Sequence, residues 1–399
     1  LSSAFLIQFY TATLEIKQKN VYNIRIIFGD YMKYIYQNKD WHCFRWYGDK
    51  IQNILLDIKK AQGYLFGKMD SLGFNVKNNA LLQVLTENIV KSSQIEGQKL
   101  DKHLVRSSIA RRLGIDTGGE VLISRDIEGV VEMMLDATQN YSDKMTKERL
   151  IGWHAALFPT GYSGMYKIDI GNYRTDKLGQ MQVVSGYSGN EKIHYEAPCA
   201  HLLESEMNEL IDYINTEEET DYLIQAAIIH LWFIILHPFD DGNGRIARAL
   251  TDMILARSDE SKFRFYSMSS QIQKNRKSYY EILEKTQKGT MDITNWLIWF
   301  LENLLISIKS SEKITTKVLE KAQFWQKHSN TIFNERQIKV LNRFMDNFEG
   351  NLTTTKWAKM CNCSQDTAAL DIKDLINKKI LKKTGKARST HYVLIKQNN

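Results

Sequence analysis

The chain has 399 residues, of which 43% are hydrophobic, 25% are charged and only 3 are proline. This composition excludes a disordered, collagen-like or disulfide-scaffold protein, and the length allows two or three domains with their own cores. Few prolines and frequent Leu, Ile, Lys and Glu favour helix. The net charge is +7, from 53 basic and 46 acidic residues. Because basic chains often bind nucleic acid or phosphate, the position of this excess matters.

The positive charge is concentrated at the end of the chain. Residues 311–399 hold 17 Lys and Arg against 8 Asp and Glu, a net charge of +9, whereas residues 1–310 carry −2. Such a change in composition predicts a domain boundary near residue 310. The four cysteines lack zinc spacing and no run of 18 apolar residues occurs. We therefore expect free thiols, a cytoplasmic location and no membrane span.

Residues 1–31 are expected to be an upstream extension that is not native, with Met32 as the true start. Their apolar stretch lacks the basic region of a signal peptide. From residue 79 to 310 apolar residues recur at helical periods, as at Leu81, Leu85 and Ile89. Residues 222–236 are apolar nearly all round, which predicts a helix at the centre of a bundle, and another helix follows over 246–257.

Strands are expected in two places. Residues 181–185 and 192–195 flank a loop that contains glycine, which predicts a β-hairpin. After residue 311 the pattern predicts a linking helix and three further helices, the third capped by Ser364, and then strands over 380–384 and 390–395. Three helices and a hairpin indicate a winged helix-turn-helix. The predicted fold class is mainly α, a helical bundle with a small hairpin and a C-terminal winged helix.

The chemistry is concentrated in residues 237–248, which read HPFDDGNGRIAR. A buried helix ends near His237, a loop with two glycines follows, and a helix opens at about Arg245. Glycine backbone and a helix N-terminus together hold phosphate, and Arg245 and Arg248 can bind further phosphate oxygens. Asp241 offers an oxygen ligand for Mg²⁺, and His237 can accept a proton at neutral pH. The alternative is a capping loop with a core histidine, which leaves this coincidence of residue types unexplained.

This string matches the signature of Fic-domain proteins, HxFx(D/E)GNGRxxR, at every fixed position. Fic proteins typically transfer AMP from ATP to a hydroxyl group of a target protein. The resemblance implies ATP as substrate, Mg²⁺ as cofactor and a target Ser, Thr or Tyr. Carried over by position, it implies His237 as the general base, Asp241 as the Mg²⁺ ligand, Gly242, Asn243 and Gly244 as an anion hole for the α- and β-phosphates, Arg245 on the β-phosphate, Arg248 on the γ-phosphate and Phe239 as a core anchor.

A second motif lies upstream. Ser92, Glu96 and Gly97 fit the family's inhibitory pattern, (S/T)xxxE(G/N). A Glu at the end of a packed helix can pair with Arg248 and occupy the place of the γ-phosphate. The alternative is a Ser-capped turn with an ordinary surface Glu. Ahead of a Fic core, the motif resembles the class with an N-terminal inhibitory helix and implies autoinhibition by Glu96.

The predicted hairpin has two interpretations. Met181, Gln182, Val183 and Val184 resemble the Fic flap, which holds the target segment by strand addition. A purely structural hairpin is the alternative. Arg174, in an element just before the flap, is either a phosphate ligand or a structural ion-pair partner, and we favour the structural role. His230, seven residues before the motif, is expected to be a core residue with a satisfied hydrogen bond.

The resemblance extends from about residue 32 to the end of the chain. Residues 32–46 look like the uncharacterised N-terminal domain that precedes some bacterial Fic cores, with His42 where that domain commonly has Pro. The expected organisation follows in four parts: 1–31, the extension; 32–110, an N-terminal helical domain that includes the motif at 92–97; 111–310, a Fic catalytic core; and 311–399, a linker helix with a winged helix.

The leading hypothesis is a protein adenylyltransferase that modifies a target protein and itself and is autoinhibited by Glu96. One alternative is a DNA-binding transcriptional regulator with a nucleotide-sensing Fic core, with Gln365, Thr367 and Lys373 as candidate DNA contacts. Leu370 stands where related helices often carry Arg, so the winged helix is as well suited to protein contacts. Another alternative is a de-AMPylating enzyme. The resemblance also allows a homodimer, because Fic cores of this kind often pair.

Overall fold

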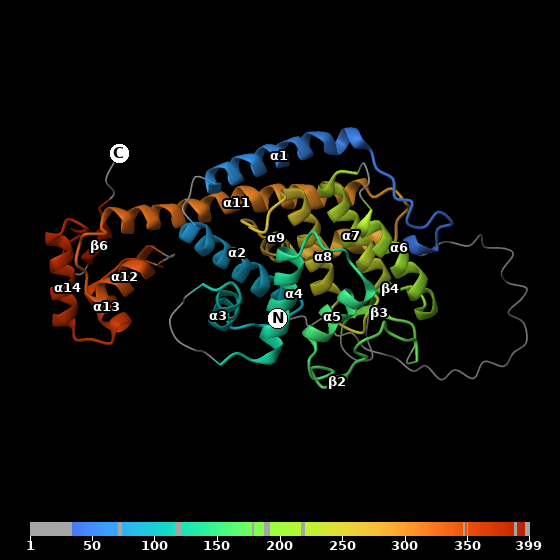
Figure 1. Ribbon diagram of the computed structural model, residues 1–399, viewed down its shortest axis with the longest axis horizontal. Helices are drawn as coiled ribbons and strands as arrows, with labels where there is room; N and C mark the ends of the chain where they lie inside the picture. Colours follow the sequence, from blue (N-terminus) through green and yellow to red (C-terminus); the bar gives the residue numbers. More distant parts are fainter. Residues whose placement is uncertain are drawn as a thin grey trace, which may run out of the picture. The chain divides into compact units, whose positions relative to one another are not determined.

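The computed structural model describes residues 34–70, 74–115, 122–177, 179–186, 192–216, 220–345, 348, 350–386 and 389–395. The expected extension over 1–31 lies outside the described residues, and so does most of the loop between the two strands of the predicted flap. The chain divides into two compact units, Leu1–Glu312 and Lys313–Asn399. Figure 1 colours them along the sequence.

In its described residues the first unit is mainly helical, with two short hairpins (Figure 1). In chain order its elements are the 3₁₀ helix η1 (Ile35–Gln37), α1 (Gly48–Asp70), α2 (Phe74–Ile95), α3 (Lys102–Arg112), α4 (Arg125–Gln139), α5 (Lys147–Leu157), β1 (Tyr162–Ser163), β2 (Tyr166–Lys167), β3 (Gln182–Ser185), β4 (Lys192–Glu196), the 3₁₀ helix η2 (Ala200–Leu202), α6 (Leu203–Asn215), α7 (Tyr222–Leu236), α8 (Asn243–Asp259), α9 (Met268–Lys274), α10 (Arg276–Gln287) and α11 (Thr294–Lys327), the last with residues of both units.

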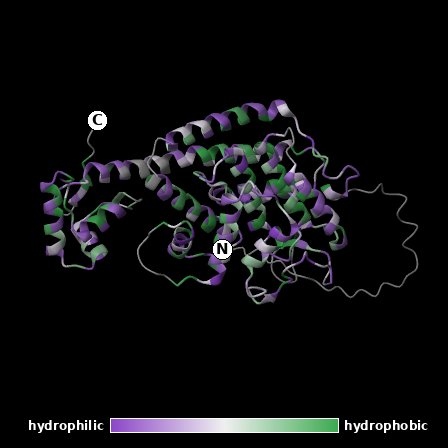
Figure 2. Ribbon diagram, viewed as in Figure 1, coloured by the Kyte–Doolittle hydropathy of each residue, from purple (hydrophilic) through white to green (hydrophobic). Residues whose placement is uncertain are grey.

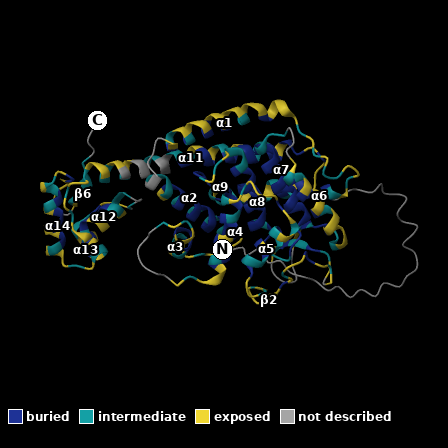
Figure 3. Ribbon diagram, viewed as in Figure 1, coloured by how far each residue is buried: buried dark blue, intermediate teal, exposed yellow. Residues whose placement is uncertain are grey.

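Helices α7 and α8 form the centre of this unit. Every residue of α7 from Leu223 to Leu236 is buried, and so is every residue of α8 from Arg245 to Ala256 (Figure 3). Apart from Gln225 and His230, nearly all residues of α7 are apolar, because neighbouring helices cover it all round. Figure 2 colours the ribbon by hydropathy. His230 is buried in α7 with Nδ1 2.8 Å from Thr251 Oγ1 and Nε2 2.8 Å from Tyr279 Oη. It is therefore a core residue whose two ring nitrogens both have hydrogen-bond partners, as predicted.

The segment before α1 packs against this centre. Tyr34 is buried and its ring meets that of Tyr195 on β4 edge to face, with centroids 5.1 Å apart. His42 stacks on Trp232 of α7 at 4.8 Å, and its Nε2 lies 2.7 Å from a carboxylate oxygen of Glu209. The backbone of His42 has φ +59°, which the proline ring cannot adopt. The turn at this position therefore has a conformation that a Pro would not allow.

The β1–β2 and β3–β4 hairpins of the first unit are both antiparallel. In the first, Tyr162 pairs with Lys167. In the second, β3 pairs with β4 from Gln182 opposite Glu196 to Ser185 opposite Lys192, and the register shifts between Val183 and Val184. The predicted flap is thus a two-stranded sheet, and its first strand begins at Gln182, with Met181 buried just before it.

The second unit contains α12 (Glu335–Met345), α13 (Thr354–Cys361), α14 (Gln365–Asn377), β5 (Leu381–Thr384) and β6 (His391–Leu394), in the order predicted. Ser364 caps α14, because its Oγ accepts the backbone N–H of Thr367 at 3.1 Å. Trp357 and Leu375 are completely buried in a separate core. Among the helices that the structure describes, none is both long and apolar enough to span a membrane.

Candidate active site

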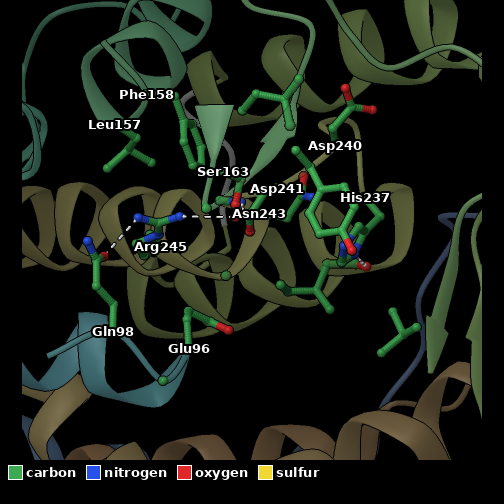
Figure 4. Close-up of a pocket in the computed structure, with 18 of the residues that line it drawn as sticks. Glu96, Gln98, Leu157, Phe158, Ser163, His237, Asp240, Asp241, Asn243 and Arg245 are labelled. Carbon is green, nitrogen blue, oxygen red and sulfur yellow. Dashed lines mark hydrogen bonds and ion pairs between the residues drawn. The ribbon is translucent and has the colours of Figure 1, made fainter. Parts of the chain in front are cut away.

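The loop between α7 and α8 starts and ends in left-handed backbone. His237, the residue that follows α7, has φ +48° and ψ +57°, and Gly242, which precedes α8, has φ +84°. These turns place His237 and the N-terminus of α8 on the same cavity (Figure 4). Because the first amides of a helix have no acceptor within the helix, the start of α8 offers N–H donors and a partial positive charge to an anion.

Contacts on several sides fix the shape of this loop. The Asn243 side chain closes it, since Nδ2 donates to the Phe239 carbonyl at 2.7 Å and Oδ1 accepts the Phe239 N–H at 3.0 Å. The Phe239 ring is fully buried and stacks on His154 with centroids 4.2 Å apart. Phe239 is therefore a core anchor, as predicted. Both polar atoms of the Asn243 side chain bond to the Phe239 backbone, so the donors available to an anion at this point are backbone amides.

The Arg174 side chain ties the start of the loop, at His237, to the segment that holds Pro198. It is buried, its Nε donates to the His237 carbonyl at 2.8 Å, and its Nη2 donates to the Pro198 carbonyl at 2.6 Å. Its Nη1 pairs with Asp176 at 2.8 Å. Since all three nitrogens are engaged in this way, Arg174 has the structural role that the sequence favoured.

His237 is set up to accept a proton. Its Nδ1 lies 3.4 Å from the Ile234 carbonyl oxygen. Because a carbonyl only accepts, Nδ1 carries the proton in this contact and Nε2 is left as the basic nitrogen. Burial, and after it the positive charge of Arg174, lowers the pKa of His237 to about 4. The imidazole is therefore neutral near pH 7, which is the state that a general base requires.

Asp241 is engaged on both carboxylate oxygens. Oδ1 accepts the Gly242 N–H at 2.6 Å, and Oδ2 accepts the Ser163 hydroxyl and lies 3.6 Å from Arg245 Nη2. No group of three or more His, Cys, Asp or Glu in the described part of the chain could hold a metal. A single carboxylate suits Mg²⁺ when phosphates and water supply its other ligands. The donor set therefore fits a Mg²⁺ that arrives with a nucleotide.

The two arginines of α8 are both buried but have different partners. Arg245 donates from Nη1 to Gln98 Oε1 at 3.1 Å, and its guanidinium lies over the Phe158 ring, 4.9 Å from the centroid. Arg248 donates from Nε to Ser92 Oγ at 2.8 Å and from Nη2 to the Ser92 carbonyl at 3.0 Å. Its Nη1 forms an ion pair with Glu96 Oε1 at 2.8 Å.

The Glu96 carboxylate lies against Gly244, in the first turn of α8. A Cβ atom built on Gly244 would be only 2.0 Å from Glu96 Oε1, so this carboxylate approaches the helix as closely as it does because Gly244 has no side chain. The Glu96 side chain is 31% exposed and lines the cavity. The carboxylate thus faces both the partial positive charge of α8 and the guanidinium of Arg248.

The end of α2 explains the spacing of the Ser92 motif. The Gln98 N–H donates to the Ser93 carbonyl at 3.0 Å, and the Gly97 N–H donates to the Gln94 carbonyl at 3.1 Å. These two bonds are those of a Schellman motif, which needs a left-handed residue at the position of Gly97. Gly97 has φ +85°, so it ends the helix and leaves Glu96 as the C-cap, the residue directly after Ile95.

Replacing Gly97 with alanine is expected to reduce the free energy of unfolding by about 1–2 kcal/mol, the cost of left-handed backbone for a residue with a Cβ. A Cβ there would meet nothing within 4 Å, so the effect arises from the backbone alone. Urea unfolding measures it. Gly63→Ala inside α1 is the matched control, since a Cβ there also meets nothing, and it should stabilise slightly. Equal effects of the two substitutions would contradict the role given to Gly97.

Glu96, Gln98, His237, Asp241 and Arg245 line one cavity of about 1570 Å³, whereas Arg248, the buried partner of Glu96, does not line it. Figure 4 shows Glu96 and Gln98 opposite Asp241 and His237. Val183 of β3 and His194 of β4 also line it. His194 connects the flap to α10, because its Nε2 lies 2.6 Å from Ser185 Oγ and its Nδ1 lies 2.8 Å from Glu284 Oε2. The hairpin therefore borders the space in front of His237.

Two segments of the chain match models of known protein families. The model of the Fic/DOC family matches residues 144–255. The chain contains a Fic/DOC domain. Residues 34–115 match a domain of unknown function, DUF4172, which confirms the expected uncharacterised domain ahead of the Fic core. The Ser92 motif lies within that segment, outside the residues that match the Fic model.

Relatives with a Fic domain are recorded in several organisms. The chain is 25% identical over 215 residues to a protein adenylyltransferase Fic of Nematostella vectensis, which is 53% of this chain and 45% of the relative. It is 34% identical over 96 residues to protein adenylyltransferase fic-1 of Caenorhabditis briggsae, 24% of this chain and 18% of the relative. The chain spans less than half the length of these curated relatives.

A solved structure shares the fold. A Fic family protein from Desulfovibrio desulfuricans superposes with a TM-score of 0.50 at 19% identity, over 88% of this chain and 97% of that chain. The mainly helical Fic fold predicted from the sequence is therefore confirmed.

The structure brings together all the residues predicted around the Fic loop, including Glu96 from α2, and the flap borders the same cavity. Sequence reasoning missed Gln98 and Ser163, which contact Arg245 and Asp241. Their only signal is position, since Gln98 follows the inhibitory motif by one residue and Ser163 lies in the hairpin after α5. Neither residue type marks a site by itself.

Proposed function

We propose that this protein is a protein adenylyltransferase that its own Glu96 holds in a low-activity state. The observation that carries the proposal is the pairing of Arg248 with Ser92 and Glu96 near the N-terminus of α8, where Glu96 lines the same cavity as a neutral His237. The names of the relatives support AMP transfer as the type of reaction.

In the active state the phosphates of ATP lie at the N-terminus of α8. The backbone amides around Asn243 and Gly244 donate to the α- and β-phosphates, and Arg245 and Arg248 bind the β- and γ-phosphates. Asp241 would hold Mg²⁺, which neutralises phosphate charge when bound. These groups act chiefly by position and charge, as is usual in phosphoryl transfer.

His237 provides the proton acceptor. The hydroxyl oxygen of a target Ser, Thr or Tyr attacks the α-phosphorus of ATP while His237 Nε2 takes its proton. A new P–O bond to the target forms, the bond between the α-phosphorus and the bridging oxygen breaks, and pyrophosphate leaves. The Ile234 carbonyl keeps Nδ1 protonated throughout, so only Nε2 is available as the base.

Glu96 inhibits because its carboxylate and a γ-phosphate require the same partner. Both are anions, and Arg248 is already bound to Glu96 at 2.8 Å. Two such anions at one guanidinium repel each other, so ATP binds in a productive pose only after Glu96 leaves. Autoinhibition therefore reduces the affinity for ATP before it affects the chemical step.

The target would bind along β3. The β3–β4 sheet has two strands, so β3 offers an edge, and Val183 faces the cavity. An extended target segment added to that edge would bring its hydroxyl group toward His237. Met181 and Val184 are buried and would keep the strand in place.

Mass spectrometry of Glu96→Gly incubated with ATP and Mg²⁺ tests the proposal. The expected result is the added mass of AMP on a mapped hydroxyl side chain of the protein itself. A variant that lacks both Glu96 and His237 provides the control and should stay unmodified. If Glu96→Gly gains no AMP while the wild-type protein, in which Glu96 could position a water, releases AMP from a modified target, the enzyme works in the removal direction and the proposal fails.

A second candidate function is DNA binding by residues 311–399, favoured by their charge of +9. Gln365 and Lys373 are exposed on α14, where a recognition helix would present them, and Leu370 beside them is 68% exposed. A gel shift that weakens steeply with salt would support this function. Unchanged mobility with every DNA tested at low salt would exclude it.

A further inference from the structure

Helices α2 and α8 contact each other at three positions spaced by one helical turn. Glu96 lies over Gly244, Ser92 binds Arg248, and one turn further on Asn88 Nδ2 donates to Asp252 Oδ2 at 2.7 Å. The numbers fall by four along α2 while they rise by four along α8. The two helices therefore run in opposite directions with their turns matched.

The third contact belongs to a fully buried polar cluster. Asn88 is 3% exposed and Asp252 is 2% exposed. Asn88 Oδ1 accepts the Ser267 hydroxyl at 2.7 Å, so both ends of the amide are engaged. Asp252 Oδ1 accepts Arg264 Nη2 at 2.9 Å, and Arg264 Nη1 donates to the Asp252 carbonyl at 2.7 Å. Groups buried in this way must keep their partners, so the cluster fixes one alignment of α2 on α8.

Glu96 depends on that alignment. It follows the last turn of α2, where the partial negative charge of the helix end disfavours a carboxylate. A slip of α2 by one residue would move Glu96 by about 1.5 Å and turn it by about 100° around the helix axis. Either change would take the carboxylate away from Gly244 and from Arg248.

We propose that Asn88 and Asp252 are positioning residues for the inhibitory glutamate, which set the alignment of α2 on α8 and so keep Glu96 at the phosphate site. The proposal deepens the regulation of the proposed function and rests on it. Neither residue touches the cavity that ATP would enter, because the lining of that cavity contains Glu96 but not Asn88 or Asp252.

The test uses a charge swap in the full chain at pH 8. Asn88→Asp sets two carboxylates against each other, so self-labelling with AMP and ATP affinity by calorimetry should both rise about five- to tenfold over wild type. Combining it with Asp252→Asn restores an amide–carboxylate pair and should return both values to within about twofold of wild type. Thr86→Val is the control on α2, since the Thr86 hydroxyl bonds only within its own helix, and it should change neither.

The outcomes separate the two proposals. Glu96→Gly is measured in parallel: if it labels itself while Asn88→Asp and Asn88→Ala stay at wild-type values for both readouts, the positioning role is overturned and the proposed function stands. If Glu96→Gly shows no labelling, the proposed function fails. The positioning role is then decided by ATP affinity alone, compared between wild type and the Asn88 variants.

Asn88→Ala replaces the swap if Asn88→Asp does not fold. A variant that is destabilised in thermal unfolding but binds ATP as wild type also overturns the positioning role.

Discussion

Glu96→Gly is expected to label itself with AMP at least about tenfold faster than the wild-type protein. The substitution removes the carboxylate that lies 2.8 Å from Arg248 Nη1, and it frees the guanidinium for a phosphate. A hydrogen bond to a charged group contributes about 1.5–3 kcal/mol, which corresponds to roughly 10- to 150-fold in affinity. The initial rate with α-labelled ATP and Mg²⁺, at an ATP concentration below saturation, measures this gain.

Glu96→Gln separates charge from shape in this experiment. Gln keeps the size of the side chain above Gly244 but loses the negative charge that attracts Arg248. We expect its labelling rate to lie between those of wild type and Glu96→Gly. Equal rates for all three proteins would show that Glu96 does not inhibit, and the paired geometry would then be structural only.

His237→Ala is expected to reduce AMP transfer by about 10²- to 10⁴-fold, the usual contribution of a general base. The comparison is made in the Glu96→Gly background, where the rate is high enough to measure. ATP affinity should stay within about twofold, because the proposed mechanism places His237 at the acceptor hydroxyl and the phosphates at the start of α8. A loss of ATP binding equal to the loss of rate would assign His237 to nucleotide binding and contradict its role as base.

The pH dependence gives a second test of the same residue. Burial and the charge of Arg174 lower the pKa of His237 to about 4. A base is active when unprotonated, so its contribution is complete well above pH 4 and is lost as the pH falls through that value. We expect kcat/KM to be flat between about pH 5.5 and 8, without the inflection near 6.5 that an ordinary histidine would give. A fall centred near 6.5 would contradict the lowered pKa.

The sequence was sufficient to predict the loop because its chemistry depends on local spacing. His237, Gly242 and Arg248 are placed by the end of one helix, a left-handed turn and the start of the next, and such features lie within a dozen residues. The burial of α7 followed from its apolar composition in the same way. The predicted inhibitory motif likewise rests on a local feature, the left-handed glycine that ends α2.

The contacts that the sequence did not reveal join distant segments through ordinary residue types. Gln98 meets Arg245 across 147 positions, and Asn88 meets Asp252 across 164. A glutamine or an asparagine in a helical pattern is usually on the surface, so neither position stands out before the helices are packed. Ser163 is similar, because only the β1–β2 hairpin brings its hydroxyl to Asp241.

In the proposed function, the placement of Glu96 makes the inhibition reversible. The end of α2 disfavours a carboxylate, whereas Arg248 and the start of α8 favour it. The Glu96 side chain is partly exposed while Arg248 is buried, so the arginine stays in place when the glutamate leaves. An activating event would then need only to move the end of α2, without rearranging the phosphate site.

The proposed competition between Glu96 and the γ-phosphate is tested most directly by comparing ATP with ADP. Calorimetry with Mg²⁺ on wild type and Glu96→Gly gives four dissociation constants. We predict that wild type binds ATP no more tightly than ADP, and that Glu96→Gly binds ATP at least about tenfold more tightly than wild type with ADP affinity changed less than threefold. An equal gain for both nucleotides, or no gain for either, would contradict the claim that Glu96 occupies the place of the γ-phosphate.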